Sequence, residues 1–423
     1  MAWRRGRAGG GHPVACARVS TVLVFVLVYI AMACGTVPGL RLDRTGAALV
    51  GAIALVATGT LSTAAAWQAI DVGTLGLLFG LMVVSAQFRL GGFYTALTRW
   101  LATRPMSPAR LLLELVLTVG ALSALLTNDV VCLAIAPVLV DACVRRGLDP
   151  VPFLLGLAAA ANVGSAATLI GNPQNMLIGQ SLQLSFAGYL LDGCVPAVLG
   201  LLATWWILAR AYRGRFERPL APGAPADRAF DRRQTGKGLA VLGMLVLGLL
   251  TCPLPREVQA LLAAGIVLSS RRTATREMLA LVDWQLLVLF AGLFVVNHAF
   301  QQAGHAAAAF ASLRDAGIDL GEPAVLFATS ALGANLISNV PLTMLLLPVA
   351  EHPQAGAILA LATTLAGNLL LPGSIANLIV VEQARVLGVQ PRDRGWAATH
   401  LRTGVPISAA TLAIAGLWLW ARS

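Results

Sequence analysis

Long apolar runs recur along the whole chain, and they constrain its fold more than any other feature. Several approach the length of about 20 residues that an α-helix needs to cross a bilayer. The chain is 57% hydrophobic and 12% charged, whereas a soluble domain carries about 25% charged residues. The pattern predicts an all-α polytopic protein with the lipid bilayer as its partner. The runs include Ser20–Gly35, Thr45–Leu61, Val72–Phe88, Cys194–Leu208, Gly238–Cys252 and Trp284–Val296.

The net charge of +11 does not indicate nucleic-acid binding, because the basic residues lie in short connections between apolar runs. There, positive charge sets the orientation of membrane helices. The six cysteines show no CxxC or CxxH spacing, so neither a zinc site nor a disulfide framework is expected. We expect no cofactor, apart from Na⁺ as a coupling ion.

The second half of the sequence repeats the first. The alignment that places Asp71 on Asp283 also places Gly80 on Gly292. With almost the same offset, Thr127-Asn128 falls on Ser338-Asn339, and a slightly shorter offset pairs "GNPQN" (171–175) with "GSIAN" (373–377). A nearly constant offset over most of each half indicates an internal repeat.

The repeat defines the expected organisation. Five crossings per half would invert the second half relative to the first, as is common in transporters. Each half is expected to contain a re-entrant hairpin and a broken helix. The expected segments are an N-terminal arm (1–19), a first repeat (20–212, hairpin about 108–143, broken helix about 151–188), a polar linker (213–237) and a second repeat (238–423, hairpin about 322–349, broken helix about 355–388).

The distribution of Lys and Arg favours a cytoplasmic linker in an inner (plasma) membrane protein, because cytoplasmic loops are enriched in positive charge. The same orientation places Arg4, Arg5, Arg7 and Arg18 of the N-terminal region outside, against that rule.

Polar residues break the apolar sequence at four repeat-related places. These are Thr127-Asn128-Asp129, Gly171–Asn175, Ser338-Asn339-Val340 and Gly373–Asn377. A single Asn or Thr in a membrane helix more often joins helices than binds a ligand. Broken helices, however, persist in a bilayer only where they are buried or line a cavity. Four such breaks at matched positions therefore favour a binding site.

The paired hydroxyl-Asn tips, "ATLIGNPQNMLIG" and "GNLLLPGSIANLIVV" resemble the ion transporter superfamily. It includes divalent anion/sodium symporters, citrate transporters, arsenite efflux permeases and certain sodium/proton antiporters. The resemblance extends from Ser20 to about Trp420 and implies an elevator-type carrier, often a homodimer. It implies substrate binding by Thr127, Asn128, Asp129, Asn172, Pro173, Asn175, Ser338, Asn339, Val340, Ser374 and Asn377. It implies coupling-ion binding by Thr127, Asn128, Asp129, Gly171, Ser338, Asn339 and Gly373.

The chain departs from the dicarboxylate symporters, which carry Ser-Asn-Thr at both tips. Asp129 and Val340 occupy the third position here, although Thr343 can partly replace the lost hydroxyl. A carboxylate at Asp129 opposes a dianion and suits a cation or a proton, because acids within membranes are usually functional. Alternatively, Asp129 is an N-cap, for which Asp is a favoured residue.

Other polar residues have simpler interpretations. Glu114 is expected to pair with an Arg, with a role in a proton path as the alternative, and His298 is expected to lie at a membrane interface. Asp71 and Asp283 are expected to cap matched helices. Arg41, Arg89, Arg99 and Arg104 are expected to be topological charges.

The sequence predicts a secondary carrier for a small anion, a di- or tricarboxylate or an inorganic oxyanion, coupled to Na⁺ or H⁺. The alternative is a Na⁺/H⁺ antiporter or an arsenite efflux permease. An enzyme is not expected, because the chain has no HExxH, GxSxG or Walker-type motif.

Overall fold

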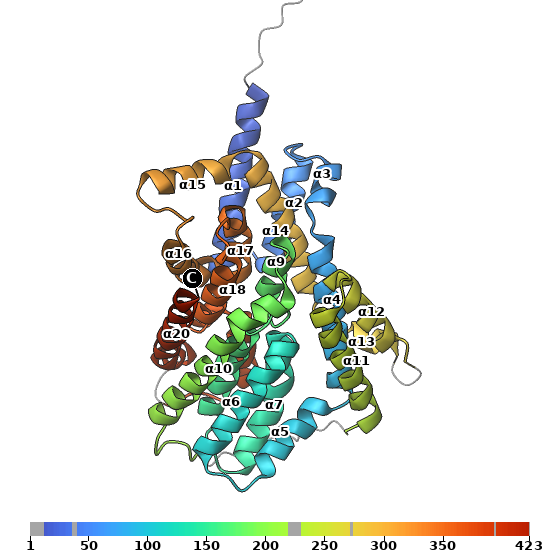
Figure 1. Cartoon of the computed structure of the whole chain (residues 1–423), viewed down its shortest axis with the longest axis vertical. Helices are drawn as coiled ribbons and strands as arrows, with labels where there is room; N and C mark the ends of the chain where they lie inside the picture. The colour runs from blue at the N-terminus through green and yellow to red at the C-terminus, as the bar shows by residue number, and fades with distance from the viewer. Residues whose placement is uncertain (1–11, 36–39, 219–229, 271–273, 393–394, 423) are drawn as a thin grey trace, which may run out of the picture. The chain divides into compact units, whose positions relative to one another are not determined.

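The structure is a computed structural model that describes residues 12–35, 40–218, 230–270, 274–392 and 395–422 (Figure 1). These residues form twenty α-helices and two 3₁₀ turns, with no β-strand among them. The first ten helices are α1 (His12–Cys34), α2 (Arg44–Ala57), α3 (Thr63–Ala69), α4 (Val72–Leu90), α5 (Phe93–Thr103), α6 (Pro108–Leu125), α7 (Asn128–Arg145), α8 (Pro150–Ser165), α9 (Pro173–Ser181) and α10 (Phe186–Ala211).

The second ten helices follow the same order. They are α11 (Arg232–Thr251), α12 (Arg256–Leu268), α13 (Thr275–Leu279), α14 (Trp284–Gln302), α15 (His305–Asp315), α16 (Pro323–Ile337), α17 (Asn339–Leu346), α18 (Ala355–Ala366), α19 (Ile375–Val386) and α20 (Trp396–Ala421). The 3₁₀ turns are η1 (Leu347–Val349) and η2 (Leu371–Gly373). Each helix of the first half thus has a counterpart ten helices later, for example α4 and α14 with 19 residues each.

Within the described part of the chain, six helices are long and apolar enough to cross a membrane. They are α4, α6, α10, α11, α14 and α20. Shorter apolar helices include α2, α8, α16 and α18. The protein is therefore a multi-pass membrane protein, as the sequence predicts.

The chain divides into two compact units, and the division cuts across the repeats. The first unit comprises the residues up to Asp71 together with Trp284–Ile318, and it contains α1, α2, α3, α14 and α15. The second unit comprises Val72–Asp283 and Asp319–Ser423. All four predicted breaks lie in the second unit.

Repeat-related helices pack reciprocally. In the second unit α4 packs on α12, and in the first unit α14 packs on α2. A Cβ on Gly80 would lie 2.6 Å from the carbonyl carbon of Ala260, and a Cβ on Gly292 would lie 2.8 Å from that of Ala48. The alignment of the two repeats places Gly80 on Gly292 and Ala48 on Ala260, so the two close contacts are equivalent. Contacts that recur with the partners exchanged are the signature of a two-fold relation.

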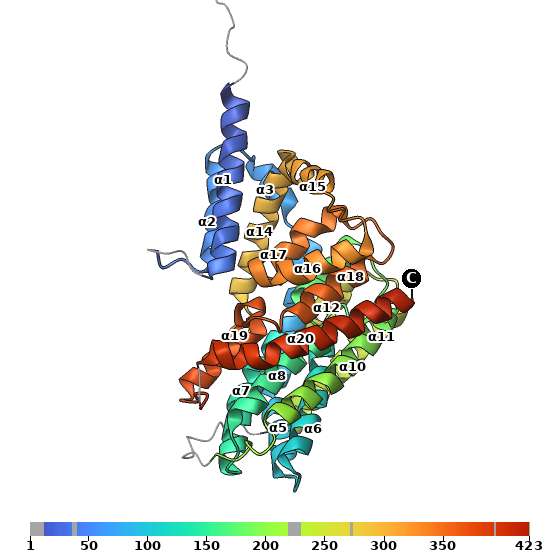
Figure 2. The same cartoon turned by 90° about the vertical axis from the view of Figure 1, so that its left-hand side faces the viewer.

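The counterparts α10 and α20 run antiparallel, side by side (Figure 2). Arg422, just after α20, pairs with Asp192 near the start of α10 at 3.3 Å. Gly200 in the middle of α10 faces Thr411 in the middle of α20. Because equivalent spanning helices run in opposite directions, the two repeats are inverted.

Helix ends differ slightly from the predicted segment borders. Asp231 caps α11, since its Oδ1 accepts from the backbone N–H of Arg233 at 2.8 Å and of Gln234 at 3.1 Å. Helix α11 therefore begins at Arg232, inside the predicted linker (213–237), whose residues 219–229 lie outside the described ones. Helix α1 begins at His12, and residues 1–11 of the predicted arm lie outside the described part as well.

Candidate functional site

The first break separates α6 from α7 at Leu126-Thr127. The backbone N–H of Asn128 donates to the carbonyl oxygen of Gly171 at 3.1 Å, and its side-chain amide donates to Asn162 Oδ1 at 3.2 Å. Three buried oxygens beside the break have no hydrogen-bond partner among the described residues. They are Ser123 Oγ, Thr127 Oγ1 and Asn128 Oδ1. Buried polar atoms are normally satisfied, so these three oxygens are candidates to contact a ligand.

The second break separates α16 from α17 at Ser338. Ser338 has a φ of 75° and a ψ of 155°, a conformation that is close to glycine-only. With the Asn339 amide oriented so that both of its ends are satisfied, its nitrogen donates to the carbonyls of Thr363 at 3.2 Å and Gly373 at 3.1 Å. Its oxygen then accepts from Gln174 Nε2 at 3.2 Å.

The residues after Asn339 are buried. Val340 is 7% exposed and contributes only apolar surface. The Thr343 hydroxyl, considered above as a replacement contact, donates to the carbonyl oxygen of Asn339 at 2.8 Å. In this conformation, it is therefore engaged with its own helix.

The third break separates α8 from α9. Asn172 caps α9 by accepting from the backbone N–H of Asn175 at 2.9 Å, and Pro173 occupies the first turn, where it loses no hydrogen bond. A Cβ on Gly171 would lie 2.3 Å from the carbonyl oxygen of Ser165 and 2.8 Å from that of Ser123. Only glycine lets the chain pass so close to these two carbonyls.

The fourth break separates α18 from α19 and repeats the third. Ser374 caps α19 by accepting from the backbone N–H of Ala376 at 3.2 Å. Asn377 Nδ2 donates to the carbonyls of Gly367 at 2.8 Å and Leu370 at 3.4 Å. The equivalent bonds in the first repeat join the Asn175 amide to the carbonyls of Ser165 and Thr168, at 3.4 and 3.0 Å. The two broken helices are thus closed by the same side-chain contacts.

Hydrogen bonds between the repeats join the two broken helices. Asn162 Nδ2 donates to Asn377 Oδ1 at 3.2 Å, and Thr364 Oγ1 donates to Asn175 Oδ1 at 3.2 Å. Asn162 and Thr364 themselves occupy equivalent positions in the two repeats. Each broken helix therefore holds the other by an equivalent bond.

A second such pair involves the capping residues. Ser374 Oγ donates to Asn162 Oδ1 at 2.8 Å, and Asn172 Nδ2 donates to Thr364 Oγ1 at 3.3 Å. All four side chains are buried, with exposures between 0 and 5%. The breaks form one buried network of neutral amides and hydroxyls, in which satisfied polar groups impose a defined geometry.

The sequence matches the family model described as "CitMHS: Citrate transporter" over residues 25–367. The chain belongs to the citrate transporter family. Among its relatives, the 46 kDa membrane protein of Mycobacterium leprae is 28% identical, over 96% of this chain and 98% of the relative. The silicon efflux transporter LSI3 of Oryza sativa is 29% identical, over 83% of this chain and 87% of the relative.

The fold of this citrate transporter family member is also found in a solved structure. The YdaH transporter of Alcanivorax borkumensis, described as having an unusual topology, matches with a TM-score of 0.58. The match covers 97% of this chain and 98% of that one at 16% identity, so it bears on the fold alone. The family match and the relatives named as transporters confirm the resemblance to the ion transporter superfamily.

Asp129 is the acidic residue nearest the network in sequence. It lies in the first turn of α7 and is partly exposed. The N-cap of this helix is Thr127, so Asp129 already lies inside the helix and is not the cap. The described residues give its carboxylate no hydrogen bond or ion pair, which leaves it available to a mobile ion.

Other predicted polar residues lie in or directly before α4, α6 and α14. Glu114 faces Arg110 one turn earlier in α6, with 4.0 Å between Oε1 and Nε, and both are substantially exposed. His298 lies in α14 of the first unit and is half-buried. Asp71 and Asp283 stand directly before α4 and α14.

Sequence reasoning does not single out Asn162 or Thr364, although both make contacts between the repeats. Each lies within a mostly apolar stretch, "AAANVGS" (159–165) and "LATTLAG" (361–367). The signal that marks them is the alignment that superimposes the flanking breaks, "GNPQN" on "GSIAN". This alignment places Asn162 on Thr364.

Proposed function

We propose that this transporter is a secondary active carrier for a small anion, a di- or tricarboxylate or an inorganic oxyanion, coupled to Na⁺ or H⁺. It would work by alternating access. The observation that carries the proposal is the set of open buried oxygens, Ser123 Oγ, Thr127 Oγ1 and Asn128 Oδ1, next to the network that joins the repeats.

The open oxygens favour a cation at the α6–α7 break. Asn128 Oδ1 can only accept a hydrogen bond or coordinate a cation. The carbonyls of Ser123 and Ser165, which face Gly171, supply further oxygen ligands of the kind that hard cations prefer. We assign the coupling ion to Thr127, Asn128, Asp129 and Gly171, with Ser338, Asn339 and Gly373 as their repeat-related counterparts.

Helix N-termini favour an anion at the same breaks. Helices α7, α9, α17 and α19 begin at Asn128, Pro173, Asn339 and Ile375, within or next to the network. The N-terminus of a helix carries a partial positive charge and free N–H groups, which bind anions without a basic side chain. We assign substrate binding to Thr127, Asn128, Asp129, Asn172, Pro173, Asn175, Ser338, Asn339, Val340, Ser374 and Asn377.

A second candidate is efflux of a weakly acidic hydroxylated solute such as arsenite, or Na⁺/H⁺ antiport. It is supported by Asp129, whose carboxylate would repel a dianion but accept hydrogen bonds from a neutral acid or exchange a proton. One relative is named as a silicon efflux transporter, and that name is consistent with efflux of a hydroxylated solute.

The proposal includes the plasma membrane as location, a cytoplasmic linker (213–237) and a homodimer. The linker side is supported by the distribution of Lys and Arg. No enzymatic activity is proposed, since relatives are named as transporters.

A flux assay tests the function. The purified protein in proteoliposomes is supplied with citrate, succinate, sulfate, phosphate, arsenite or silicic acid, under an imposed Na⁺ or pH gradient. Uptake of a carboxylate or oxyanion driven by one gradient supports the anion carrier. Movement of arsenite or silicic acid alone supports the second candidate, and cation exchange without any solute supports antiport. Absence of every flux from folded protein would overturn both.

Two substitutions test the assignment of the site. Asn128→Ala and Asn339→Ala are each expected to reduce flux by about tenfold or more, because each removes amide contacts that cost about 1–3 kcal/mol when their partners stay buried. The melting temperature of each variant, measured in detergent, controls for folding. Near-normal flux in both variants would refute the site assignment.

A further inference from the structure

We propose that a pocket separate from the network of the breaks binds a phosphate group. Its volume is about 200 Å³, and it lies where α10 ends and α20 begins. The residues that matter to the proposal are Asp149, Tyr212, Arg215, Arg392, Thr399 and Arg402. None of these residues is assigned above to the binding of the substrate or the coupling ion.

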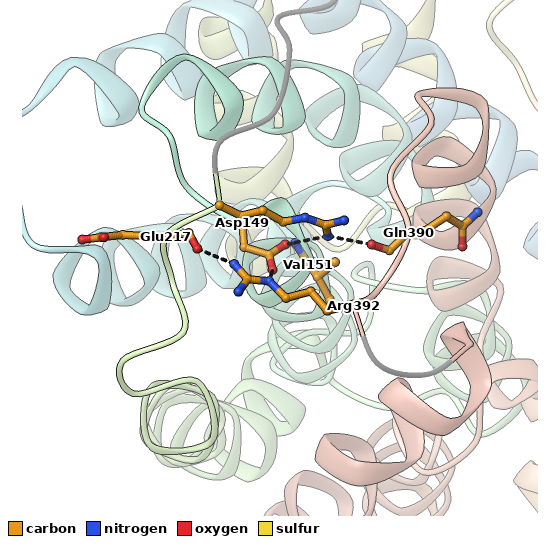
Figure 3. Close-up of polar contacts among 6 residues, drawn as sticks. Asp149, Val151, Glu217, Gln390 and Arg392 are labelled. Atoms are coloured by element: carbon orange, nitrogen blue, oxygen red, sulfur yellow. Dashed lines mark hydrogen bonds and ion pairs between the residues drawn. The ribbon is translucent and has the colours of Figure 1, made fainter.

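A buried carboxylate organises one wall of the pocket (Figure 3). The Asp149 side chain is 4% exposed and caps α8 by accepting from the backbone N–H of Val151 at 3.1 Å. Arg392 Nε lies 3.0 Å and Arg218 Nη1 lies 3.7 Å from its two carboxylate oxygens. Arg218 comes from the segment after α10, and Arg392 from the segment before α20.

The two arginines also join the segment after α10 to the segment before α20. Arg218 Nη1 donates to the carbonyl oxygen of Gln390 at 2.8 Å, and Arg392 donates to the carbonyl oxygen of Glu217. The backbone N–H of Asp149 donates to the carbonyl oxygen of Phe216 at 2.7 Å. The pocket wall is therefore fixed before a ligand arrives, which lowers the entropic cost of binding.

The pocket carries a surplus of positive charge. Among the described residues that line it, three are basic (Arg215, Arg392 and Arg402) and Asp149 is the only acid. The Glu217 carboxylate points away from the cluster in Figure 3.

Two donors on α20 remain open. Among the described residues, the Arg402 guanidinium and the Thr399 hydroxyl have no side-chain hydrogen bond or ion pair. Both lie in the first two turns of α20, whose N-terminal end favours negative charge. A guanidinium group can donate two parallel hydrogen bonds to two oxygens of one phosphate. The pocket volume of about 200 Å³ is smaller than the volume of about 300–1,000 Å³ that is typical of sites for whole cofactors. A single phosphate group fits these donors and this size.

The position of the pocket indicates two sources for that group. Helices α10 and α20 are both candidate membrane spans, and the pocket lies at their adjoining ends. Lipid phosphates lie at this level of a bilayer, and basic pockets between membrane helices bind acidic lipid headgroups. Phosphate dissolved in the adjoining water has the same chemistry.

The test uses the full chain in two arms. In the first, inorganic phosphate is titrated against the melting temperature in detergent, with chloride matching the ionic strength. In the second, retention of phosphatidylglycerol or phosphatidylcholine is measured by native mass spectrometry. The double variant Arg215→Gln/Arg402→Gln is compared with the parent and with Arg233→Gln, an exposed arginine on α11 outside the pocket.

The double variant is expected to weaken the phosphate-dependent shift or the retention of phosphatidylglycerol by about tenfold or more, since charge-assisted bonds are lost. Arg233→Gln is expected to behave as the parent. A loss in the first arm identifies free phosphate, and a loss in the second identifies a lipid headgroup. If the double variant does not fold, Arg402→Gln alone serves, because its guanidinium has no partner among the described residues.

Phosphate binding at the transport network must be distinguished from binding in this pocket. Asn128→Ala is expected to keep the response that Arg402→Gln loses. The proposal is overturned if the double variant matches the parent in both arms, or if Asn128→Ala alone abolishes the response.

Discussion

Ser338 stands at the second hairpin break with a φ of 75° and a ψ of 155°, where a side chain costs about 1–3 kcal/mol. Ser338→Gly is expected to raise the free energy of unfolding by about 1 kcal/mol, because glycine adopts this conformation without strain. Thr127, at the matching break, has a φ of −60° and a ψ of 129°, so Thr127→Gly is expected to lower stability by a similar amount.

The measurement is thermal unfolding of both variants in detergent. A lower melting temperature for Ser338→Gly would show that contacts of the serine side chain outweigh the strain. Flux is measured alongside, since strained residues gather at binding sites and Ser338 belongs to the proposed one.

Asp129 is expected to determine the coupling ion. Asp129→Asn removes the charge and the ability to release a proton, so the variant should either lose the pH dependence of flux or need about tenfold more Na⁺ for half-maximal flux. Glu114→Gln is the matched control, because that acid pairs with Arg110 on the exposed face of α6. An unchanged coupling profile in Asp129→Asn would leave this residue a merely structural role.

The residues at the four breaks could be predicted from the sequence, whereas their partners could not. Polar residues interrupt the apolar runs at Asn128, Asn175, Ser338 and Asn377. This contrast between polar and apolar residues can be read from the sequence alone. Asn162 lies within α8, where a lone amide resembles an ordinary link between helices. Its bonds to Ser374 and Asn377 depend on how the two repeats meet in space, and sequence periodicity does not contain that information.

At the scale of helices, close packing depends on glycines at repeat-related crossings. Gly80→Ala is expected to lower the free energy of unfolding by about 1–3 kcal/mol, because its Cβ would lie 2.6 Å from the Ala260 backbone and force α4 from α12. Gly292→Ala, at the matching crossing of α14 with α2, should have a similar effect. Gly265→Ala in α12 is the control, since nothing lies within 4 Å of its added Cβ.

Melting temperatures of the three variants in the same detergent check this expectation. If Gly80→Ala is as stable as Gly265→Ala, the helices can separate without loss, and the close crossing contributes nothing to the fold. A large loss for Gly80→Ala with none for Gly292→Ala would argue that the two crossings are not equivalent.

The long apolar helices could be predicted, but the short connecting helices could not. The sequence predicts five crossings, a hairpin and a broken helix in each repeat, and it does not predict the short helices α3, α5, α13 or α15. Two of these, α5 and α15, begin after Gly92 and Gly304, whose φ values are 68° and 78°. A positive φ lets the chain turn sharply after the preceding spanning helix. Such turns become visible only when the backbone conformation is known.

At the scale of the whole molecule, the inversion of the repeats has a consequence for sidedness. Helices α10 and α20 end at equivalent positions, Ala211 and Ala421, yet they run antiparallel. The linker after α10 and the C-terminus after α20 must therefore face opposite sides of the membrane. The distribution of Lys and Arg favours a cytoplasmic linker, and in that orientation the C-terminus would lie outside.

An epitope inserted between residues 219 and 229 of the linker and a second epitope after Ser423, in the same full-length chain, test this arrangement. Antibody added to intact spheroplasts is expected to reach the C-terminal epitope only, and antibody added to inside-out vesicles the linker epitope only. Flux through the tagged protein controls for folding. Epitopes on the same side would contradict the inversion. If antibody reaches the linker epitope from outside and the C-terminal epitope from inside, the repeats are still inverted but the orientation of the protein is reversed. In that case the N-terminal arm with Arg4, Arg5 and Arg7, rather than the linker, obeys the positive-inside rule.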